Sequence, residues 1–167
     1  MFHSDENTAT LNTLIATLID SVEGYQKSAA DVDNPRYAQL FKARAEERKT
    51  AVDQLQAAVV AQGGTPEDDG SLMGSIHRAF LSLREAVSTR DDAAIIAEIH
   101  HGEHYLKDKF ETALDSDTLA AAPRAAVQSV WNSVKAGHDE MWQLNQAVQN
   151  NEPRAGSPSA GQDSRAA

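Results

Sequence analysis

Apolar residues recur every three or four positions along most of this chain, which restricts it to packed amphipathic helices. In residues 8–30 this spacing places Leu11, Leu18 and Tyr25 on one face, and no stretch of the chain shows the alternation that a half-buried strand needs. Residue types that favour helices also dominate the composition. We therefore predict an all-α protein. The expected helices cover residues 8–30, 35–62, 71–87, 92–114 and 123–149.

Helix-breaking residues separate these segments and predict the topology. Pro35 can occupy the first turn of a helix but cannot continue one, and Gly63 with Gly64 ends the second segment. Tight connections make each long pair an antiparallel hairpin, so residues 71–87 would cross between the two hairpins. This order predicts a ferritin-like antiparallel four-helix bundle with a crossover helix between its second and third long helices. A five-helix bundle of another connectivity is the alternative.

The chain length fits one domain. A chain of 167 residues can bury one substantial core but is too short for two. We expect the helical bundle to span residues 8–149, after an N-terminal extension over residues 1–7. Residues 150–167 contain no large apolar side chain, so we expect them to form a disordered C-terminal tail.

The charge of the chain excludes several kinds of partner. The formal net charge is -10 at pH 7, with a pI near 4.9, so nucleic acid and anionic membranes would repel the protein. Cysteine is absent, which excludes thiolate chemistry. The start of the chain does not resemble a secretion signal, and no apolar run approaches the ~20 residues that cross a bilayer. We expect a cytoplasmic protein that binds neither nucleic acid nor membranes.

Charged residues interrupt the apolar faces near the middle of the long helices. Arg48, Glu103 and His138 each fall near the centre of such a face. Arg44 and Glu23 lie close to the same faces. A charge that leaves water for a protein core needs a partner there. These residues therefore mark the place where a functional site is expected.

Four segments of the chain resemble a known family. They are LNTLIATLIDSVEGYQKSAADV, LFKARAEERKTAVDQL, GSLMGSIHRAFLSL and IIAEIHHGEHYLKDKFETAL. Together they resemble the ferritin-like four-helix-bundle family of unknown function found mainly in proteobacteria, over residues 8–148. The resemblance implies the bundle with its crossover helix, and it implies no established activity.

Ferritin-like di-iron sites offer a sharper comparison, because they take one Glu from each of two helices and a Glu-x-x-His motif from each of the other two. In this chain Lys49, Thr50 and Lys135 stand where some of these ligands are required. Two iron ions need more carboxylates than remain, so a di-iron centre is not expected. A single iron, manganese or zinc ion, held by Glu23, Glu103 and His138, is the alternative interpretation. The candidate metal ligands are Glu23, Glu47, Glu103 and His138.

The interpretation that we favour is a buried ionic layer in place of the metal. Arg48 would meet Glu103 or Glu23, and Arg44 would meet the other carboxylate. A histidine and a tyrosine would complete the hydrogen bonds. Such a layer can fix the register of the helices. The expected layer consists of Arg44, Arg48, Glu103, His138 and Tyr25.

A second group of polar residues lies in the segment EIHHGEHY, residues 98–105. On a helix, His100 and His104 form one row beside Glu103, while His101 and Glu98 point further outward. Each of these pairs has the spacing to share a surface ion. A solvated helix face explains the same residues, and we favour it.

These patterns together indicate a non-enzymatic helical bundle. We expect no cofactor, with a divalent metal only in the alternative interpretation. A stress-associated or partner-binding role is expected, with an unknown protein partner or a second copy of the chain in a homodimer. Trp131 and Trp142 lie near one face of the last helix, so at least one of them should pack in the core or in a dimer interface.

Overall fold

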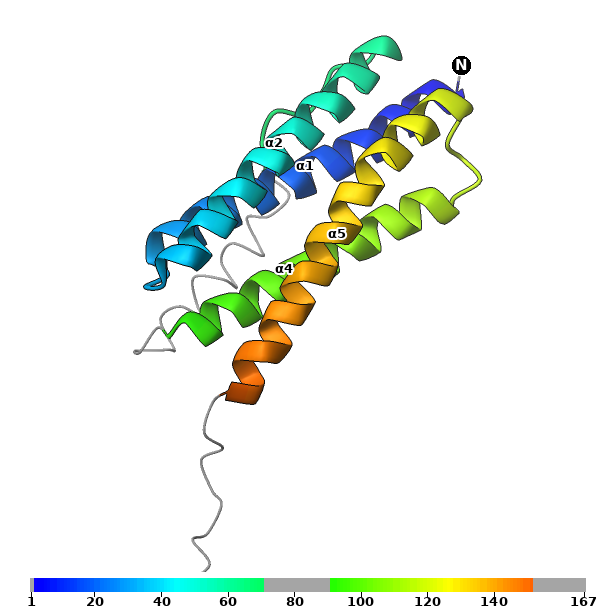
Figure 1. Cartoon of the computed structure of the whole chain (residues 1–167). Coiled ribbons are helices and arrows are strands. Elements are labelled where there is room, and N and C mark those ends of the chain that lie inside the picture. Colours follow the sequence, from blue (N-terminus) through cyan, green and yellow to red (C-terminus); the bar gives the residue numbers. More distant parts are fainter. Residues whose placement is uncertain (1, 71–90, 152–167) are drawn as a thin grey trace, which may run out of the picture.

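The computed structural model describes residues 2–70 and 91–151, and within these ranges every regular element is a helix (Figure 1). The prediction of an all-α protein is thus confirmed for the described residues. The crossover helix expected at residues 71–87 lies outside them. So does the tail expected at residues 150–167, except for its first two residues, which continue the last helix. The helices are α1 (Phe2–Asp31), α2 (Pro35–Ala61), α4 (Asp92–Asp115) and α5 (Ala121–Asn151).

Three of the helix ends follow from their residues as expected. Asn34 caps α2, its side chain accepting a hydrogen bond from the Arg36 amide, and Pro35 occupies the first turn. Gly63 ends α2 with a φ of 77°, a conformation that favours glycine. Asp91 caps α4 by accepting a hydrogen bond from the Ala94 amide.

The start of α1 was predicted too late. The helix begins at Phe2 rather than near Thr8, because its first turns have partners at the end of the bundle. Asn7 is buried, and its side chain accepts a hydrogen bond from the Ala120 amide at 2.9 Å. The Ser4 hydroxyl reaches the Gln62 carbonyl at 3.3 Å. Residues 2–7 therefore continue the bundle instead of forming a separate extension.

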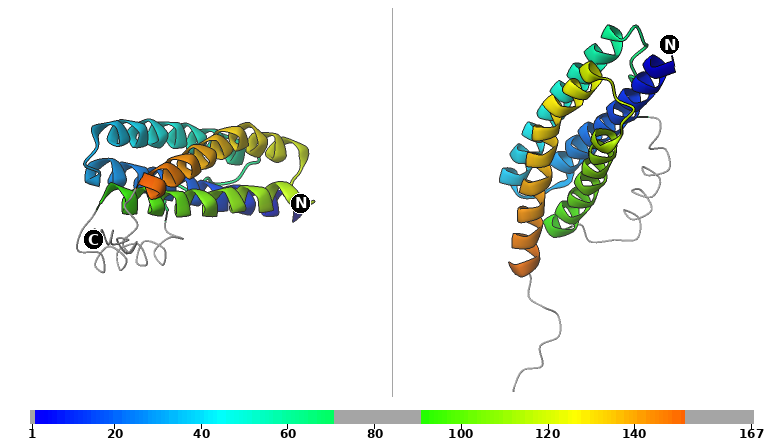
Figure 2. Two further views of the ribbon diagram at one scale, coloured as in Figure 1. Left: turned by 60° about the horizontal axis from the view of Figure 1, so that its bottom comes forward. Right: turned by 90° about the vertical axis from the view of Figure 1, so that its right-hand side faces the viewer.

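The four described helices pack as two hairpins against each other (Figure 2). Helix α1 packs on α2, and α4 packs on α5. Between the hairpins, α1 contacts α4 and α2 contacts α5. None of the described helices contains a stretch apolar enough to cross a membrane.

Hydrogen bonds at the two ends of the bundle show which helix ends lie side by side. The start of α1 lies beside the end of α2, where the side-chain amide of Asn12 donates a hydrogen bond to the Thr65 carbonyl at 3.0 Å. At the opposite end, the Asp92 carboxylate accepts hydrogen bonds from the amides of Asp33 and Asn34 at 2.8 and 2.9 Å. The chain therefore leaves α2 at one end of the bundle and enters α4 at the other.

The apolar core consists of two clusters along the bundle axis. The larger cluster contains Leu55 and Phe110, and Trp131 packs against it with its ring stacked on that of Phe110. The smaller cluster contains Phe41 and Met141. In α2, α4 and α5 the buried residue between the two clusters is Arg48, Glu103 and Gly137 respectively, so the apolar packing is interrupted at this level. This break in the core is where the candidate site lies.

Candidate functional site

A buried ion pair joins the two hairpins at the break between the core clusters. Arg48 on α2 is 0% exposed and Glu103 on α4 is 2% exposed. One guanidinium nitrogen, Nη2, donates to both carboxylate oxygens, at 3.0 Å to Oε1 and 2.8 Å to Oε2. Both charges are out of water, so each depends on the other for its compensation.

Tyr25 brings α1 into the same site. Its hydroxyl donates to Glu103 Oε1 at 2.8 Å, and its ring lies against Phe41 in the smaller core cluster. Burial, followed by the negative charge of Glu103, holds the pKa of Tyr25 well above its ordinary value. The phenol therefore stays protonated and remains a hydrogen-bond donor to the carboxylate.

Gly137 on α5 makes room for the guanidinium. A Cβ atom added at this position would lie 2.3 Å from Arg48 Nη2 and 3.2 Å from Glu103 Oε2. Gly137 is not among the site residues that the sequence predicts. An isolated glycine inside an otherwise regular helical pattern was the available signal, since glycine lowers helix stability unless packing requires it.

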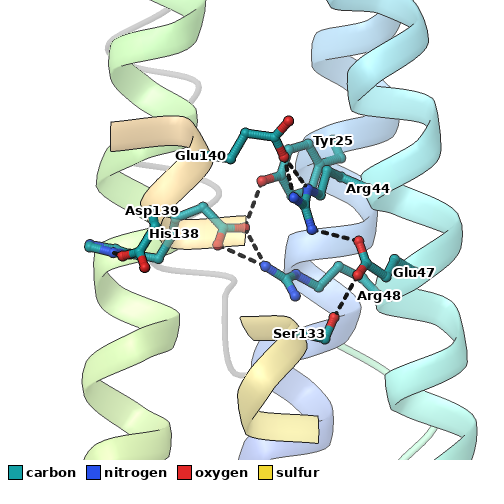
Figure 3. A network of polar contacts seen from close by, with 9 residues as sticks. Tyr25, Arg44, Glu47, Arg48, Ser133, His138, Asp139 and Glu140 are labelled. Atoms are coloured by element: carbon teal, nitrogen blue, oxygen red, sulfur yellow. Dashed lines mark hydrogen bonds and ion pairs between the residues drawn. The ribbon is translucent and has the colours of Figure 1, made fainter. Parts of the chain in front are cut away.

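A second, more exposed ion pair joins α2 to α5 beside the buried one (Figure 3). Arg44 Nε donates to Glu140 Oε2 at 2.8 Å, and Arg44 Nη1 donates to Glu47 Oε2 at 2.6 Å. The other Glu47 oxygen accepts a hydrogen bond from the Ser133 hydroxyl at 3.0 Å. Together with the buried pair and the hydrogen bond from Tyr25, these contacts link all four described helices at one level of the bundle.

Arg48 does not use all of its donors in this arrangement. Nε and Nη1 are buried and have no hydrogen-bond partner in the protein. An arginine that engages a carboxylate through one nitrogen gains less than one that uses its two-pronged fork. The pair is consequently better suited to setting the register of the helices than to raising stability.

The sequence placed Arg44, Arg48, Glu103 and Tyr25 at one site, and the structure brings these four together. His138 lies elsewhere. Its side chain is 13% exposed, and its Nδ1 atom faces the Asp139 carboxylate at 3.1 Å. Its ring lies beside those of His100 and His104 on α4, and its contact with Asp139 replaces the hydrogen bond to a layer residue that the sequence predicted.

The structure does not gather the candidate metal ligands. Glu23 is exposed on α1, and Glu47 is bound to Arg44 near the surface. Both oxygens of Glu103 accept hydrogen bonds from Arg48. Among residues 2–70 and 91–151, no three His, Asp or Glu side chains are placed so as to hold a metal ion. The negative charge of Glu103 is instead compensated by the guanidinium of Arg48.

Comparison with known proteins gives one family. The sequence pattern of a domain of unknown function, DUF2383, matches residues 6–116, which include most of α1 and the whole of α2 and α4. No individually curated protein matches the chain. The matched region contains Tyr25, Arg44, Arg48 and Glu103, whereas Gly137 and Glu140 lie beyond it.

Proposed function

The chain belongs to the DUF2383 family, a domain of unknown function, and we propose a non-enzymatic, partner-binding role for it on the basis of its buried ionic layer. In this proposal the protein is a ferritin-like bundle in which a buried ionic layer replaces the metal site. The single observation that carries the proposal is the contact of Arg48 with both oxygens of Glu103.

The direction of the helices supports the ferritin-like part of the proposal. Helix α2 ends beside the start of α1, and α4 begins beside the end of α1. The connection between the hairpins therefore joins opposite ends of the bundle. Ferritin-like folds make this connection with one long crossover between their second and third helices.

The charge balance supports the replacement of the metal. In a ferritin-like site, metal cations neutralise the carboxylates that point into the bundle. Here the guanidinium of Arg48 supplies the positive charge beside Glu103, and Gly137 provides the space that it fills. The charge of the inward-facing Glu103 carboxylate is thereby neutralised without a metal ion.

Manganese binding tests this replacement. We expect wild-type protein, purified without a tag, and the double variant Arg48→Met/Glu103→Leu to give the same Mn²⁺ binding curve by electron paramagnetic resonance. The double variant removes both buried charges together, so neither is left uncompensated and the bundle is expected to fold. Stoichiometric Mn²⁺ binding by the wild type that the double variant lacks would refute the replacement.

The binding role is proposed to be contact with a second copy of the chain in the cytoplasm. Trp142 on α5 supports this proposal, because its side chain is 49% exposed and aromatic residues are enriched at the centres of protein interfaces. Sedimentation equilibrium should show a dimer for the wild type and a monomer for Trp142→Gln. Val60→Gln, which changes an exposed apolar residue on α2, is the matched control and should remain a dimer. A monomeric wild type would contradict this assignment.

A further inference from the structure

A short segment after α2, residues 64–70, runs back along the surface of α1. Its start is held by the Asn12 side chain, which donates to the Thr65 carbonyl at 3.0 Å and accepts from the Glu67 amide at 2.8 Å. From α2, Gln56 Nε2 donates to the Glu67 carbonyl at 2.9 Å. These hydrogen bonds join side-chain amides to the backbone, so the pH does not change the charge of any group in them.

The end of the segment lies against a carboxyl group of α1. A Cβ atom added at Gly70 would overlap with Asp20 Oδ1 and would lie 3.4 Å from Ile19 Cγ2, so the backbone passes closely over these side chains. The other oxygen of Asp20, Oδ2, is buried and has no hydrogen-bond partner among the described residues. A carboxylate in this position would lose water without a compensating contact, and the docked segment therefore favours the neutral carboxyl group.

The charged groups that act on Asp20 are both acidic. Glu23 lies on the same helix, and Asp69 lies on the segment itself. Among the described residues, no cation from α1, α2, α4 or α5 forms an ion pair with Asp20. Burial, followed by the charges of Glu23 and Asp69, raises the pKa of Asp20 to about 7. Ionisation of Asp20 would thus place a further negative charge beside two others.

We propose that Asp20 is a pH-dependent latch, which holds the end of segment 64–70 against α1 while its carboxyl group is protonated and releases it when the group ionises. Release lets water reach the carboxylate and lets Asp69 move away from it. Because the docked state binds the proton more tightly than the released state, docking is strongest below the ordinary pKa of 3.8 and weakens as the pH rises to about 7. Asn12 and Gln56 keep the start of the segment in place throughout.

Carbon-detected nuclear magnetic resonance of the full chain, recorded from about pH 4 to about pH 8, tests the latch. The carboxyl carbon of Asp20 should titrate with a midpoint well above 3.8, and the backbone signals of Gly70 should change with the same midpoint. Those of Thr65 should not follow this transition. In Asp20→Asn, which resembles the protonated side chain, Gly70 should lose the transition. An Asp20 midpoint near 3.8, or a Gly70 transition that persists in Asp20→Asn, would overturn the proposal.

The charge on the segment provides a second test. Asp69→Asn removes one of the two charges that disfavour ionisation, so the midpoint of Asp20 should move to lower pH. The matched control is Asp68→Asn, which changes the exposed neighbour and should keep the wild-type midpoint. An unchanged midpoint in Asp69→Asn would show that the segment does not lie against Asp20, and the latch would be refuted.

Discussion

Arg48 is the residue on which the site depends, because it places a full positive charge where the core is otherwise apolar. Its desolvation is offset by one carboxylate, and Tyr25 supports that carboxylate from a third helix. Two of its nitrogens have no partner in the protein. The sequence revealed this residue because a charge at the centre of an apolar face is rare. The sequence did not predict which carboxylate would pair with the guanidinium, because Glu23 and Glu103 both lie on or near the apolar face of their helix.

Gly137→Ala should destabilise the protein, in contrast to most replacements of a helical glycine. The new Cβ atom would lie 2.3 Å from Arg48 Nη2, so the guanidinium would have to move away from Glu103. We expect the free energy of unfolding in urea to fall by about 1–3 kcal/mol. The matched control is Gly102→Ala on α4, where a Cβ meets nothing within 4 Å; it should gain about 0.5–1 kcal/mol. Equal effects in the two variants would show that the guanidinium does not need this space.

Asp20 gives stability a dependence on pH that is separate from the ionic layer. Burial, then the charges of Glu23 and Asp69, raise its pKa from 3.8 to about 7. The folded state therefore favours the protonated carboxyl, and this contribution is complete below pH 4 and is lost as the pH rises to about 7. Asp20→Asn should match the wild type near pH 4 and exceed it by about 1–2 kcal/mol above pH 7, a figure reduced for solvent screening.

Thermal unfolding from pH 4 to pH 8 measures this difference. The exposed Asp53→Asn on α2 is the control, and its difference from the wild type should stay flat across the range. An Asp20→Asn curve that runs parallel to the wild-type curve would exclude a raised pKa at Asp20.

At the scale of the helices, capping residues predicted boundaries well where the cap is local and poorly where it comes from elsewhere in the chain. Pro35 and Gly63 act within their own turns, and both helix ends were correctly expected. The start of α1 was not predicted, because Asn7 has its hydrogen-bond partner at Ala120, far away in the sequence.

The orientation of the His138 ring was not predicted for a related reason. Its position on the helix was evident, but the direction of its ring depends on the packing of α5 against α4.

The contact of Asp92 with the connection between α1 and α2 should hold the two hairpins together. Its carboxylate accepts the amides of Asp33 and Asn34, so Asp92→Ala would leave both without this acceptor. We expect a loss of about 1–3 kcal/mol in unfolding free energy and faster hydrogen exchange at these two amides. Asp91→Ala removes the cap of α4 but leaves this contact, so exchange at the two amides should remain slow.

The whole molecule is a bundle of helices whose core is divided by a polar layer. Helical periodicity was sufficient to predict the all-α fold, because every long segment presents one apolar face. The same periodicity located the level of the layer, where Arg48 and Glu103 interrupt two of those faces. It could not predict that Gly137 would open the space, or that Arg44 would pair with Glu140 from the last helix. Those contacts depend on how the two hairpins pack, which is a property of the assembled bundle.

The central claim is that Arg48 and Glu103 compensate each other inside the bundle, and a double-mutant cycle in urea tests it most directly. We expect Arg48→Met and Glu103→Leu each to lower the free energy of unfolding by about 3–5 kcal/mol, because each leaves one buried charge alone. The double variant should lose far less than the sum of the two, since neither charge remains. Additive losses, with no coupling between the two positions, would contradict the account.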